Sequence, residues 1–122
     1  MRRLFVLVAL AIAGSVQAQP VLKDYPKLKA QPCFKMYIDG LGTGIREANV
    51  ALLVRNQARL YCPPPKLAMH SENYIDILER EINAGITGIT RPAPLPPVPY
   101  PEDTPIETIL LQGLQKTFPC KQ

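Results

Sequence analysis

The three cysteines of this 122-residue chain are its side chains most able to form covalent bonds. Cys120 stands two residues from the end, where a terminal turn frays and little packing is available. Cys33 and Cys62 are the other two, so one thiol must be left over or pair with another molecule. Which two pair depends on the compartment and on the elements that carry them.

Catalytic or cofactor chemistry has little support in the sequence. His70, the only histidine, lies between a proline-rich turn and a predicted helix start, which favours a surface or capping role. The glycines of "GLGTG" (40–44) fall inside an amphipathic pattern and are not typical of a dinucleotide loop. Asp39 is a lone carboxylate, and Glu79 and Glu81 occupy helix positions expected to be solvated. We predict no enzyme activity, no bound metal and no cofactor.

Residues 1–18, "MRRLFVLVALAIAGSVQA", have the features of a secretory signal peptide. Two arginines precede an apolar run, and Val16 and Ala18 supply the small residues of a cleavage site after Ala18. The alternative is an uncleaved membrane anchor, but the run is about half the ~20 apolar residues that span a bilayer. We expect a soluble periplasmic protein, without membrane contact after cleavage, in a compartment where disulfides persist.

The remaining residues, 19–122, predict one small domain whose modest core often benefits from a covalent staple. Without Arg2 and Arg3 the formal charge falls from +4 by two, and no long block of like charges remains. Nucleic acid is therefore not an expected partner.

Residues 19–32 carry three prolines and no sustained period, which predicts an extended N-terminal arm. A helix is predicted from about Pro32 to Arg59, because apolar side chains recur there at spacings of three and four. Its glycines, within residues 40–44, cost about 1 kcal/mol each relative to alanine. A close approach by another helix, or a kink, would explain them. The predicted apolar stripe is Phe34, Ile38, Leu41, Ile45, Ala48 and Leu52.

A second helix is predicted after the three prolines at 63–65, which cannot continue the first one. Ser71 has the residue type of an N-cap, and Gly85 that of a helix stop. A proline-rich loop follows at 90–103, where the composition favours polyproline II. The second helix carries the stripe Tyr74, Ile75, Leu78 and Ile82.

The last helix is predicted from a capping box in "TPIE", with Thr104 as N-cap, Pro105 at N1 and Glu107 at N3. The fold class is therefore all-α: a small bundle of three main helices with a proline-rich connection and a disulfide staple. The stripe of the last helix is Ile106, Leu110, Leu114 and Phe118.

The helices restrict the pairing of the cysteines. Cys33 and Cys62 bracket the first long helix and would lie up to about 43 Å apart, unless that helix breaks sharply at its glycines. If the second and last helices pack antiparallel, Cys120 meets Cys62, with about 4 kcal/mol from loop closure, and Cys33 stays a free thiol. The connection is long enough to permit a parallel arrangement too.

Three blocks of the sequence resemble, in order, segments of the Tai-like immunity proteins: "CFKMYIDG" (33–40), "LYCPPPKLAMHSENYIDILEREI" (60–82) and "PIETILLQGLQKTFPCK" (105–121). That family consists of small periplasmic helical proteins of the type VI secretion amidase immunity class. Its members commonly carry a further cysteine ahead of the first block, and residues 19–32 contain none. This departure accounts for an unpaired Cys33.

The resemblance implies inhibition by docking, with a secreted peptidoglycan amidase effector as the partner. The proline-rich loop replaces a shorter connection and could be the docking loop, with Arg91, Pro96, Pro97 and Tyr100 as contacts, or simply a spacer. The alternative function is a periplasmic helper of the same fold without a toxin target. An exposed Cys33 or a self-complementary helix face could support a homodimer.

Overall fold

The computed structural model describes residues 19–86 and 96–121. Its helices are the 3-10 helix η1 (Leu22–Asp24), α1 (Tyr25–Lys29), α2 (Phe34–Val54), α3 (Ser71–Ala84) and α4 (Ile106–Thr117). The described residues form no strand, only two isolated bridges. The predicted all-α class is confirmed, but the described residues form four α-helices where the sequence predicted three. The predicted signal peptide, residues 1–18, lies outside the described part of the chain.

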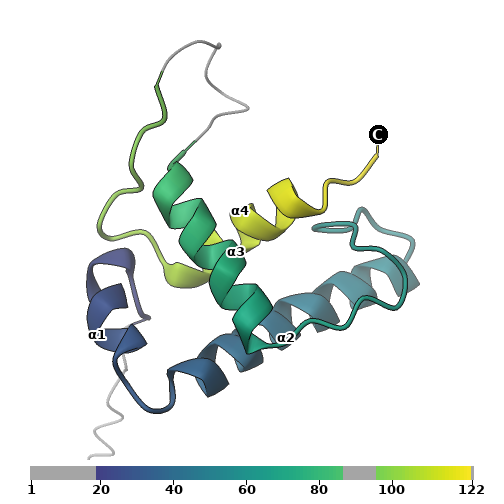
Figure 1. Ribbon diagram of the computed structural model, residues 1–122. Coiled ribbons are helices and arrows are strands. Elements are labelled where there is room, and N and C mark those ends of the chain that lie inside the picture. The colour runs from purple at the N-terminus through teal and green to yellow at the C-terminus, as the bar shows by residue number, and fades with distance from the viewer. Residues whose placement is uncertain (1–18, 87–95, 122) are drawn as a thin grey trace, which may run out of the picture.

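The core lies where α2, α3 and α4 meet, and Figure 1 shows α4 crossing behind α3. Gly113 brings these two helices together, because a Cβ atom at this position would lie 2.7 Å from the Ile77 side chain. The predicted stripes of α3 and α4 face this core. Fully buried there are Ile38, Tyr61, Tyr74, Leu78, Ile106, Ile109, Leu110 and Leu114.

α2 is the longest helix, and its two halves have different surroundings. Phe34 and Ile38 of the predicted stripe are buried, whereas Ala48 is exposed. In Figure 1 the C-terminal half of α2 extends past α3. The periodicity therefore identified the apolar face of this helix, but only the N-terminal half of that face is covered by the core.

α2 ends at Val54, earlier than the predicted end at Arg59. Asn56 takes a left-handed conformation with φ 54°, which this residue type tolerates better than most. The amide of Gln57 then donates to the Leu52 carbonyl at 2.9 Å, so the turn satisfies carbonyls that the helix leaves open.

The glycines of α2 divide into two kinds. A Cβ atom at Gly42 would lie 2.5 Å from the ring of Tyr74, so the close approach of another helix is real at this position. At Gly40 and Gly44 an added Cβ meets nothing within 4 Å, and the close-approach interpretation is wrong for both.

The prediction of an extended arm at 19–32 is wrong, because η1 and α1 occupy residues 22–29. Pro26 stands in the first turn of α1, where its missing amide hydrogen costs nothing. Tyr25 is buried edge-on against Phe34, with ring centroids 5.8 Å apart, and its hydroxyl donates to Glu79 at 3.0 Å. Docking of Tyr25 therefore holds this segment on the bundle.

The predicted caps of α3 and α4 are displaced by one residue. The N-cap of α3 is His70 rather than Ser71, and the His70 amide donates to Asn73 Oδ1 at 2.9 Å. The N-cap of α4 is Pro105 rather than Thr104, and no side chain caps this helix.

The N-terminal segment takes the place of the missing side-chain cap on α4. The amide of Ile106 donates to the Pro20 carbonyl at 3.1 Å, and the amide of Leu22 donates to the Thr104 carbonyl at 2.9 Å. The capping-box prediction failed because a distant piece of backbone satisfies the first amide of the helix.

Candidate functional site

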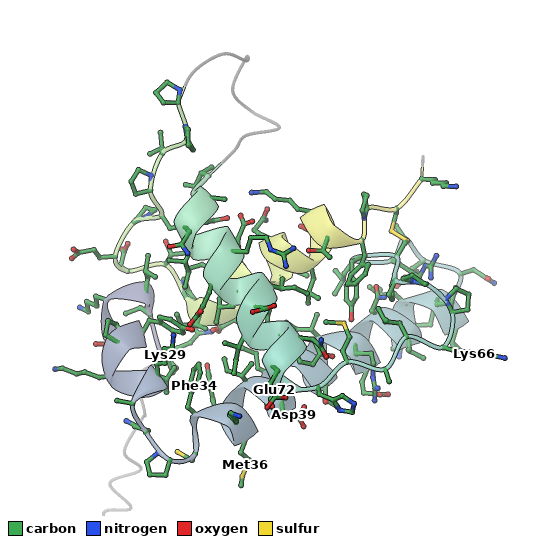
Figure 2. The ribbon with its side chains drawn as sticks, viewed as in Figure 1. Lys29, Phe34, Met36, Asp39, Lys66 and Glu72 are labelled. Atoms are coloured by element: carbon green, nitrogen blue, oxygen red, sulfur yellow. A yellow bond between two sulfur atoms is a disulfide. The ribbon has the colours of Figure 1, made fainter. Side chains whose placement is uncertain are left out.

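The predicted disulfide joins Cys62 to Cys120, whose Cα atoms lie 4.9 Å apart (Figure 2). The Cys62 amide also donates to the Phe118 carbonyl at 2.8 Å, so the backbone is paired beside the covalent bond. Cys33 is exposed and free. A disulfide is typical of a protein from an oxidising compartment.

The helix packing that brings these two cysteines together differs from the predicted packing. The two helices cross instead of lying side by side antiparallel, and the segment after α2 carries Cys62 to the C-terminal end of α4 (Figure 1). The buried side chain of Asn49 holds that segment, accepting from the Leu60 amide at 2.7 Å and donating to the Tyr61 carbonyl at 2.9 Å. Sequence reasoning missed Asn49, whose only signal was a polar residue in an apolar stretch of helix.

Glu81 of α3 was predicted to be solvated, but it is only 4 % exposed. Its side chain contacts α4 and the proline-rich loop. Its Oε1 accepts from the Tyr100 hydroxyl and from Lys116 Nζ, each at 2.5 Å. The prediction was wrong because two donors distant in sequence converge on this carboxylate. Burial, and then the hydrogen bond to Glu81, raise the pKa of the Tyr100 hydroxyl.

A backbone contact closes the base of the proline-rich loop beside this carboxylate. The Ile86 amide donates to the Val98 carbonyl at 2.7 Å. Gly85 ends α3 with φ 67°, and a Cβ atom there would lie 2.5 Å from the Val98 oxygen. We call this arrangement of Gly85, Ile86, Val98, Tyr100 and Glu81 the loop neck.

The predicted partner contacts occupy different places relative to the loop neck. Pro96 and Pro97 are exposed on the returning limb of the loop. Tyr100 is half-buried with its hydroxyl engaged by Glu81, so it anchors the loop. Arg91 lies outside the described residues.

A concave region of about 470 Å³ lies between α1, the start of α2, and α3. Both lysines of its rim are paired: Lys29 contacts Glu79, and Lys35 contacts Glu72 at 2.9 Å. The Lys35 hydrogen bond, helped by backbone and Ser71 contacts, lowers the pKa of Glu72 to about 2. Asp76, which also lines this region, forms no ion pair among the described residues.

The side chains that could bind a metal ion are dispersed over residues 19–86 and 96–121. His70 is exposed at the start of α3. No group of three histidine, cysteine or acidic side chains is arranged there to hold a metal ion. In the same part of the chain, no helix has both the length and the apolar character needed to cross a bilayer.

Comparisons with known protein families, with curated proteins and with solved structures give no match to this chain. The resemblance to the Tai-like family rests on the three sequence blocks alone. We take the loop neck, which includes Tyr100 and adjoins the exposed Pro96 and Pro97, as the candidate site.

Proposed function

We propose that this chain is a periplasmic immunity-type protein that binds and inhibits a secreted peptidoglycan amidase. The three sequence blocks support the choice of partner. A small helical domain with a Cys62–Cys120 staple is suited to a compartment where secreted toxins act.

The observation that carries the proposal is the loop neck. The Ile86–Val98 hydrogen bond and the Tyr100–Glu81 hydrogen bond hold the two limbs of the proline-rich loop at one place on the bundle. Pro96 and Pro97, which adjoin this base, are exposed to solvent. They belong to a proline-rich sequence that favours the stiff polyproline II conformation. A segment that is ordered before binding loses less entropy when it docks.

Protection of living cells tests the proposal. Cells that export a peptidoglycan amidase to the periplasm should survive when they express the full chain. The same chain without residues 1–18 should give no protection, because only the predicted signal would deliver the inhibitor to the compartment of the toxin. Survival that is equal with both chains, or absent with both, would contradict the proposal.

A loop replacement tests the role of the loop separately. Residues 87–97 are replaced by a Gly/Ser linker of equal length, which keeps the reach, removes Arg91, Pro96 and Pro97 with the sequence that favours polyproline II, and leaves the loop neck intact. If the loop docks, the variant stays folded and its affinity for the amidase falls about ten-fold or more. Unchanged affinity would show that the loop is a spacer.

A further inference from the structure

The C-terminal end of α2 presents apolar side chains to solvent. Val50 and Val54 stand one turn apart on one side of the helix, and Leu53 adjoins them. Their exposed fractions rise toward the end of the helix, from 46 % at Val50 through 52 % at Leu53 to 77 % at Val54. Because this half of α2 extends past α3 in Figure 1, these side chains lie on a projecting part of the molecule.

The backbone at this helix end is already hydrogen-bonded. The last carbonyls of a helix lack partners within the helix, and an unpaired carbonyl costs free energy in apolar surroundings. Three of them accept from amides of the turn that follows α2: Ala51 from Arg55, Leu52 from Gln57 and Leu53 from Asn56. Contact of this helix end with an apolar phase therefore leaves these carbonyls satisfied.

The charged residues at this end are basic. Residues 50–70 contain Arg55, Arg59 and Lys66 and no acidic side chain. All three are exposed, and none forms an ion pair with another described residue. Asn49 holds the segment of Arg59 against α2, since its Oδ1 accepts from the next amide at 2.7 Å. Lys66 lies at the same edge of the molecule as the end of α2 in Figure 2.

We propose that the end of α2 docks on an anionic lipid surface. Val50, Leu53 and Val54 contact the outer part of the acyl chains, and the three cations contact headgroup phosphates. Apolar side chains flanked by basic ones bind the interface of an anionic bilayer through both contributions. A projecting helix end fits a deformable lipid surface, whereas a rigid protein partner would need a matching hollow.

The proposed contact is peripheral, because a few side chains at a helix end do not cross a bilayer. It departs from the sequence expectation that the chain does not touch a membrane after cleavage, which considered the length of apolar runs alone. The inference goes beyond the proposed function and holds whether or not the protein binds an amidase.

Vesicle flotation tests this surface with a defined probe. The exported protein, with its disulfide intact, is mixed with vesicles of phosphatidylglycerol and phosphatidylcholine in equal parts, or with vesicles of phosphatidylcholine alone. The fraction of protein that floats with the lipid measures binding. We expect binding to the mixed vesicles only, and weaker binding as salt is added, since salt screens the contact between cations and headgroups.

Two variants separate the apolar contribution from the charged one. Val54→Ser should weaken binding about five-fold, because an apolar side chain no longer contacts lipid. Arg55→Gln should also weaken binding about five-fold and should lower its salt dependence. Arg59→Gln takes the place of Arg55→Gln if circular dichroism shows that the latter loses helix.

Met36→Ser is the matched control for the apolar change. Met36 is 78 % exposed and lies near the other end of α2, where it points away from the helices in Figure 2. Its replacement should leave binding to the mixed vesicles like that of the wild type.

Three results would overturn the inference. Equal flotation with both kinds of vesicle, or none with either, would exclude anionic lipid as the occupant. An equal loss of binding in Met36→Ser and Val54→Ser would show that the end of α2 is not the contact. Binding to soluble poly-glutamate, with none to vesicles, would assign this surface to an acidic protein instead. Because no amidase is used, none of these results bears on the proposed function.

Discussion

The two ends of the α3 and α4 pair are closed by different chemistry. At one end the Cys62–Cys120 disulfide and the buried Asn49 amide hold the segment after α2. At the other end the loop neck is held by Glu81 and by one backbone hydrogen bond to Val98. The first closure depends on oxidising conditions, whereas the second depends on hydrogen bonds to one buried carboxylate and to one backbone carbonyl.

This difference shows which part of the molecule can change without breaking the fold. The disulfide acts on the whole chain, since it restricts the unfolded state. The loop neck acts locally, because its loss frees one loop and leaves the helices paired. Variants at the two ends should therefore differ in size of effect and in the region that responds.

The largest effect is expected at the disulfide. Cys62→Ser or Cys120→Ser should lower the free energy of unfolding by about 4 kcal/mol, as estimated for a closed loop of this length. Urea denaturation under non-reducing conditions measures this change. Cys33→Ser is the control and should change little, because Cys33 is exposed and free. Equal stability of the Cys62 and Cys33 variants would contradict the comparison.

Removing the buried carboxylate should have the next largest effect. Glu81→Ala leaves Tyr100 and Lys116 without their acceptor, which should cost about 2 kcal/mol. Hydrogen exchange should show lost protection of the Ile86 amide while the amides of α4 stay protected. Glu72→Ala, an exposed change on the same helix, is the control. Uniform loss of protection over all helices would mean that the neck is not a local closure.

Substitutions at two glycines should change the stability of the protein in opposite directions. Gly85→Ala should destabilise the protein by about 1–2 kcal/mol, because its φ is positive and an added Cβ meets the Val98 oxygen. Gly44→Ala should stabilise it by up to about 1 kcal/mol, because it lies in a helix with open space around it. Thermal unfolding measures both. The same sign for both changes would contradict the described surroundings of these residues.

The smallest expected effect is the loss of stability at low pH when the ion pair that holds α1 is protonated. The contact with Lys29 holds the pKa of Glu79 below its usual value of 4.5, so the unfolded chain takes up this proton first as the pH falls. The contribution is present above pH 4.5 and is lost as the pH falls through the lowered pKa. Because the Glu79 side chain is 34 % exposed, we expect less than about 1 kcal/mol. Unfolding of Glu79→Gln should depend less on pH between 5 and 3, and an unchanged dependence would exclude this role.

Apolar spacing was enough to predict the three main helices and their core faces. Spacing alone could not show that the face of α2 near Ala48 lacks a partner, since a helix pattern carries no information about what covers it. The α1 segment was missed because Pro26 interrupts the pattern, although a proline in a first turn is tolerated.

The candidate site was less predictable than the fold. The pairing of Cys62 with Cys120 followed from elimination and an assumed packing, and the pairing is correct although the packing is not. The role of Glu81 depends on Tyr100 and Lys116, which only the folded chain brings to it. A carboxylate beside an arginine in sequence gives no sign of such burial.

Calorimetric titration tests the central claim most directly. The exported protein is titrated into a purified secreted peptidoglycan amidase from the same organism, and hydrolysis of peptidoglycan is followed in the same mixtures. The account predicts saturable one-to-one binding with loss of hydrolysis at equivalence, for the wild type and for Cys33→Ser alike. Absence of binding heat together with full hydrolysis at excess protein would contradict it.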